Sequence, residues 1–90
     1  MSNIYCLVLG SNYIKEDVTA FFDTIPQVEF WFSTLPASIF IKSGLSAKQI
    51  SDMVTEKFGG HSHFISEVTD KYWGRLDDKL WKHFLTPKLS

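Results

Sequence analysis

The stretch from residue 39 to residue 60 restricts the possible folds more than any other part of the chain. It reads I-F-I-K-S-G-L-S-A-K-Q-I-S-D-M-V-T-E-K-F-G-G. Its first residues are β-branched or aromatic and Ser43-Gly44 ends the run, which predicts a buried strand. Ser46 and Gln49 have the spacing of a capping box, and Gly59-Gly60 supplies a stop. The stretch therefore predicts a strand followed at once by a helix.

The remaining elements follow from hydrophobic periodicity. Residues 4–9 are apolar at every position, which indicates a strand that is covered on both faces and central in its sheet. Residues 13–25 have apolar side chains at helical intervals, and Ser11 or Asn12 is placed to cap this helix. Residues 28–33 and 63–68 have the composition of two further strands.

The order of these elements is strand, helix, strand, strand, helix, strand. That order predicts an α+β, ferredoxin-like βαββαβ domain spanning residues 1–90, with a four-stranded antiparallel sheet and two helices on one of its faces. A short C-terminal helix that Asp77 would cap is expected to follow.

One face of such a sheet is not covered by the helices. We expect Trp31, Phe40 and Ile65 on that face, beside Lys42 and His63. An aromatic patch with charges among it predicts contact with a second subunit, with residues 72–85 or with a ligand. Because 44% of the 90 residues are hydrophobic and a core of this size is marginal alone, we favour a homodimer.

Composition also limits the classes of function. A net charge of −1 argues against a strongly electrostatic nucleic-acid binder, although a local basic patch stays open. The single Cys6 excludes an internal disulfide, and we expect a cytoplasmic protein without a membrane segment. His61 and His63 have no partner at metal-ligand spacing, so we interpret them as turn or surface residues. No cofactor motif is present, and no cofactor or metal is expected.

The segments S-I-F-I-K-S-G-L-S-A-K-Q-I, H-F-I-S-E-V-T and W-G-R-L-D-D-K-L-W-K-H-F together resemble the Cas-two-like family, small bacterial and phage proteins related to CRISPR-associated protein two. The resemblance runs from Trp31 onward and implies a ferredoxin-like homodimer. In the nuclease members, an Asp at the end of the first strand is thought to hold a metal near the dimer axis. The matching positions here are Gly10, Ser11 and Asn12, whose neutral oxygens are poor sole ligands for a hard divalent cation.

Three functions remain open. The first, which we favour, is a homodimeric, non-catalytic module that binds protein or nucleic acid. The second is a divalent-metal-dependent endoribonuclease or endonuclease of the CRISPR or toxin–antitoxin type, with Asp17 as a substitute ligand. The third is an RNA binder in which bases stack on Trp31 and Phe40.

Overall fold

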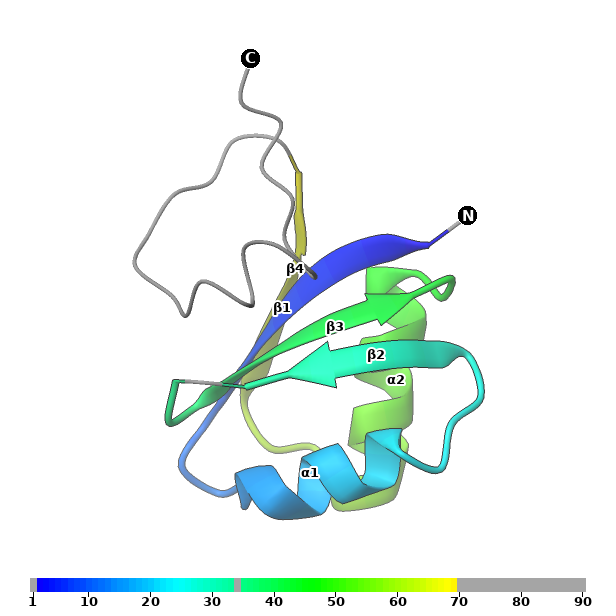
Figure 1. The fold of residues 1–90 in the computed structure, drawn as a ribbon. Coiled ribbons are helices and arrows are strands. Elements are labelled where there is room, and N and C mark those ends of the chain that lie inside the picture. Colours follow the sequence, from blue (N-terminus) through cyan, green and yellow to red (C-terminus); the bar gives the residue numbers. More distant parts are fainter. Residues whose placement is uncertain (1, 34, 70–90) are drawn as a thin grey trace.

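The computed structural model describes residues 2–33 and 35–69, which form a four-stranded sheet and two helices. In chain order these elements are β1 (Asn3–Leu9), α1 (Lys15–Phe22), β2 (Val28–Phe32), β3 (Ser38–Ser43), α2 (Ala47–Phe58) and β4 (His63–Val68). Both helices lie on the same side of the sheet (Figure 1). The prediction of a small α+β architecture is confirmed, and the arrangement is compatible with a ferredoxin-like fold. The helix expected after Asp77 lies outside the described residues.

The sheet has the strand order β2-β3-β1-β4, and every neighbouring pair is antiparallel. In the registers of β1 with its neighbours, Leu7 lies opposite both Ile39 of β3 and Ile65 of β4. β1 is therefore an inner strand, as its continuous apolar run predicted. Its second face is covered less completely than expected, because Val8 is 44% exposed.

Helix α2 has the predicted termini. The Ser46 hydroxyl accepts a hydrogen bond from the Gln49 backbone amide at 3.1 Å, and the Gln49 side-chain oxygen accepts one from the Ser46 amide at 2.8 Å. This reciprocal pair satisfies two amides that the first helical turn leaves free. At the other end, Gly59 has φ +97°, a backbone conformation that residues other than glycine rarely adopt.

Helix α1 is shorter than its apolar periodicity predicted, and the prediction of a Ser11 or Asn12 cap is wrong. The residue before its first turn is Ile14, which is extended and offers no side-chain hydrogen bond. A turn comes first, in which the Tyr13 amide donates to the Gly10 carbonyl at 3.2 Å. The Asn12 side chain instead reaches the His61 ring at 3.4 Å, so it is directed toward the start of β4 rather than toward α1.

The core lies between the sheet and the two helices. Its fully buried side chains come from the inner strands and from the sheet-facing side of each helix, and they are Leu7, Val18, Phe22, Ile39, Ile41, Ile50 and Val54. These residues fix which side of each strand faces the helices. Neither helix in the described ranges is long and apolar enough to cross a membrane.

Candidate functional site

The sheet has a second face, which we call the open sheet face, directed away from both helices. It follows from the register, because successive side chains of a strand point to opposite faces and the core residues occupy the other face. Phe40 of β3 lies opposite Cys6 of β1 and Phe32 of β2, and Lys42 lies opposite Phe30. The apolar side chains on this face are Ile4, Cys6, Val8, Phe30, Phe32, Phe40, Phe64 and Val68.

Three of the apolar side chains on this face, Val8, Phe30 and Phe64, are exposed. Phe64 is 66% exposed and Phe30 is 46% exposed, and Lys42 brings a positive charge to the neighbouring position on β3. Cys6, also on this face, is half-buried, and that burial raises the pKa of its thiol. Phe30 and Phe64 lie on the two edge strands of the sheet, and exposed apolar side chains on one face are typical of a surface that binds a partner.

The predictions that Phe40 and Lys42 occupy this face are confirmed, whereas those for Trp31, Ile65 and His63 are wrong. Trp31 lies opposite the fully buried Ile41, and its indole nitrogen donates to the Asp23 carboxylate at the end of α1 at 2.7 Å. Ile65 lies opposite Leu7 and packs on the core. His63 lies opposite the buried Leu9, so all three of these residues face the helices.

The His63 ring is engaged on the helix side of the sheet. Its Nε2 lies 2.7 Å from the Ser51 hydroxyl of α2, and its Nδ1 lies 3.0 Å from the Tyr13 hydroxyl. The interpretation of His63 as a turn or surface residue is thus wrong, because the ring is half-buried within a hydrogen-bonded cluster. The exposed His61 side chain fits that interpretation.

A bulge in β2 explains part of the wrong face assignment. Val28 pairs with Ser43 while Phe30 pairs with the adjacent Lys42, so Glu29 is an additional residue between the two pairs. The bulge leaves Val28 packed on the core and turns Phe30 to the open sheet face. Regular alternation would place Val28 and Phe30, which are two residues apart, on one face.

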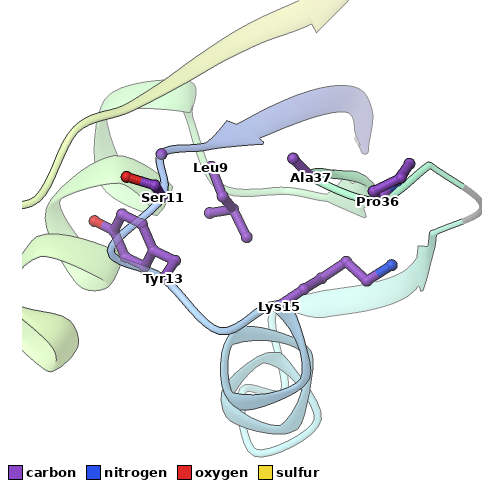
Figure 2. Close-up of a pocket in the computed structure, with 7 residues that line it drawn as sticks. Leu9, Ser11, Tyr13, Lys15, Pro36 and Ala37 are labelled. Carbon is purple, nitrogen blue, oxygen red and sulfur yellow. The ribbon is translucent and has the colours of Figure 1, made fainter.

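The loop after β1 contains Gly10, Ser11 and Asn12, the positions at which the resemblance led us to expect the counterpart of a metal site. The Gly10 amide donates to the Ser62 carbonyl at 2.9 Å, which ties this loop to the start of β4. A hollow of about 340 Å³ lies beside the loop, lined by Leu9, Gly10, Ser11, Tyr13, Lys15, Pro36 and Ala37. Figure 2 shows the Ser11 and Tyr13 hydroxyl oxygens pointing away from Leu9 and Lys15.

The chemistry of this hollow does not suit a divalent cation. Among the described residues its lining contains no carboxylate, and the Lys15 ammonium donates to the Leu35 carbonyl at 3.3 Å beside it. Asp17 lines a different hollow, between the helices, together with Phe21 and Lys57. Across residues 2–33 and 35–69, no group of three or more His, Cys, Asp or Glu side chains is placed to hold a metal ion.

Comparison with known proteins gives one partial similarity. The chain is 38% identical over 70 residues to the major envelope glycoprotein of Choristoneura fumiferana nuclear polyhedrosis virus, a match that covers 66% of this chain and 14% of that protein. The chain thus spans about a seventh of that glycoprotein's length. No protein-family model matches the sequence, and no solved structure matches it.

Proposed function

We propose that this chain is a homodimeric, Cas-two-like binding module of ferredoxin-like fold, and that the open sheet face binds a second copy of the chain. The observation that supports the proposal is the set of exposed apolar side chains on that face, led by Phe64 at 66% exposure. Burial of exposed phenylalanine surface would stabilise a dimer by about 25 cal/mol for each Å² removed from water. Two copies related by a two-fold axis would bury the same residues on each side.

The size of the face limits the strength of the dimer. Four strands spaced about 4.8 Å apart and about 20 Å long present a flat area of roughly 400 Å². Stable protein–protein interfaces bury about 800 Å² on each partner. We therefore expect a dimer that dissociates in the micromolar range, unless residues beyond the sheet add to the contact.

A pair of glutamate substitutions tests this proposal. Phe64→Glu places a charge on the open sheet face, and Thr55→Glu places the same charge on the exposed surface of α2. Light scattering at about 100 µM, well above a micromolar dissociation constant, should give a dimer for the wild type and for Thr55→Glu and a monomer for Phe64→Glu. A wild-type monomer, or equal masses for the two variants, would contradict the proposal.

A second candidate function is the binding of single-stranded nucleic acid on the same face. The observation in its favour is the register that sets Lys42 beside Phe30 and Phe40 beside Phe32, since aromatic rings near a cation are a common base-stacking surface. Titration with a labelled single-stranded RNA at several salt concentrations tests it. Phe40→Ala should abolish a stacking contribution, and Lys42→Ala should reduce the salt dependence by about one phosphate contact.

The metal-dependent nuclease is the alternative that the geometry supports least. Gly10, Ser11 and Asn12 offer no carboxylate, and Asp17 lines a separate hollow. We expect single-stranded RNA and duplex DNA to stay intact with the purified chain in magnesium or manganese. Cleavage that requires the metal and is lost in Asp17→Ala, but not in Asp52→Ala, would favour the enzyme instead.

A further inference from the structure

A hydrogen-bonded cluster on the helix side of the sheet joins three segments that are distant in sequence. The Ser51 hydroxyl of α2 lies 2.7 Å from His63 Nε2 at the start of β4. On the other side of the ring, His63 Nδ1 lies 3.0 Å from the Tyr13 hydroxyl and 3.2 Å from the His61 carbonyl. Both nitrogens of the His63 imidazole therefore have hydrogen-bond partners.

The contacts of Tyr13 determine which nitrogen of His63 carries the proton. The Tyr13 hydroxyl donates to the His61 carbonyl at 3.1 Å, and burial raises the pKa of the Tyr13 phenol, so this donor keeps its proton at neutral pH. Nδ1 then faces two oxygen acceptors, the Tyr13 hydroxyl and the His61 carbonyl. A proton on Nδ1 satisfies both contacts, whereas a lone pair there would face the carbonyl oxygen without a hydrogen between them.

The opposite tautomer fits the cluster less well. If Nδ1 were unprotonated, the Tyr13 hydroxyl could donate to Nδ1, but it would then no longer donate to the His61 carbonyl. With the proton on Nδ1, the lone pair of Nε2 is directed at Ser51, whose hydroxyl donates to it. This is the arrangement in which a histidine can accept a proton from a serine nucleophile.

We propose that Ser51 and His63 form a nucleophile and general-base pair that takes an acyl group from a small activated ester. The Ser51 oxygen attacks the ester carbonyl while its proton passes to His63 Nε2. The His61 carbonyl and the Tyr13 hydroxyl then accept from Nδ1 and occupy the place that a carboxylate has in a catalytic triad. When the tetrahedral adduct collapses, the carbon–oxygen bond to the leaving group breaks, Nε2 returns the proton to that group, and acylated Ser51 remains.

Both members of the pair are accessible to a small reagent. Ser51 and His63 are half-buried rather than enclosed, and no other hydrogen bond of the Ser51 hydroxyl competes with its bond to His63 in the described chain. Tyr13 acts as a positioning residue, because it touches the imidazole and not the ester. The pair lies on the opposite side of the sheet from Phe64, so its reactivity is independent of the binding face.

Acylation with p-nitrophenyl acetate, mapped residue by residue by mass spectrometry, tests the proposal in the wild-type chain. Ser66 is the internal control, since it is exposed and, within residues 2–33 and 35–69, its hydroxyl contacts only the neighbouring Glu67 carbonyl, at 3.4 Å. General-base assistance accelerates such reactions by about 100-fold or more, so Ser51 should acylate at least about 100-fold faster than Ser66. Equal rates at the two serines would overturn the proposal without recourse to any variant.

Two substitutions test whether the acylation rate of Ser51 depends on the His63 imidazole. His63→Gln should lower the Ser51 rate to within a few-fold of the Ser66 rate, whereas Lys57→Gln, on the exposed surface of α2, should leave the Ser51 rate unchanged. A Ser51 rate that survives His63→Gln, or that falls equally in His63→Gln and Lys57→Gln, would contradict the assignment.

Discussion

Replacing Gly10 with alanine should destabilise the fold, because the backbone of Ser62, just before β4, approaches Gly10 too closely for a side chain. A Cβ atom at this position would lie 2.5 Å from the Ser62 carbonyl oxygen, which belongs to the backbone and has little freedom to move. That carbonyl also accepts the Gly10 amide at 2.9 Å. Relief of the overlap therefore separates the two segments and weakens the bond between them.

The expected magnitude follows from these two effects. Loss of the hydrogen bond costs about 1 kcal/mol, and a forced shift of well-packed backbone costs about 1–3 kcal/mol more. The free energy of unfolding should fall by about 2–4 kcal/mol, which corresponds to a decrease in Tm of roughly 10–25 °C for a domain of this size. Urea unfolding followed by circular dichroism measures the change directly.

Gly44→Ala is the matched control for this prediction. A Cβ at Gly44 meets no atom within 4 Å, and its φ is not positive. Alanine there should be neutral or stabilising by about 0.4–1 kcal/mol, because it reduces the freedom of the unfolded chain. If Gly10→Ala and Gly44→Ala unfold at the same urea concentration, the close approach of the two segments is refuted.

Two smaller perturbations test other parts of the structure. Ser46→Ala removes one half of the capping box and should lower the free energy of unfolding by about 1 kcal/mol, measured by the same urea titration; no change would mean that α2 does not depend on its cap. Cys6 has a raised pKa, so its contribution to stability is fully present below the pKa of an unfolded cysteine and is lost as the pH rises through the folded value. Iodoacetamide at pH 8 should therefore alkylate Cys6 more slowly in the folded chain than in urea, and equal rates would contradict its burial.

The sequence could predict elements whose signals are local. The capping box at Ser46 depends on residues three apart, and the turn to positive φ at Gly59 depends on a single residue type, so both were readable without tertiary information. The continuous apolar run of β1 likewise predicted an inner strand. Each of these signals comes from side chains that are close together along the chain.

The face assignment failed because it depends on pairing between distant strands. Trp31 and Ile65 belong to faces that only the register with β3 and β1 can fix, and the bulge at Glu29 changes the alternation within β2. Phe64 and Phe30 were identified as strand residues but were not assigned to the open sheet face. The signal that could have found them is the pairing of β2 with β3 and of β4 with β1, because the buried residues of β3 and β1 mark the helix-facing side.

The hydrogen-bonded cluster around His63 was beyond sequence analysis for a similar reason. Ser51 and Tyr13 are separated from His63 by 12 and 50 residues in the sequence, and no spacing motif connects them. The turn at Gly10 brings Tyr13 to the start of β4, and the packing of α2 on the sheet brings Ser51 to the ring. Both depend on the completed fold.

The central claim, that the open sheet face binds a second copy, is tested most directly by hydroxyl-radical footprinting of the wild-type chain over a dilution series. Phe64 is 66% exposed and Ile14, at the start of α1, is 62% exposed, so the two residues form a matched pair on different surfaces. As the protein concentration rises through the micromolar range expected for an interface of this size, oxidation of Phe64 should fall while oxidation of Ile14 stays constant. Oxidation of Phe64 that is the same at every concentration would contradict the claim.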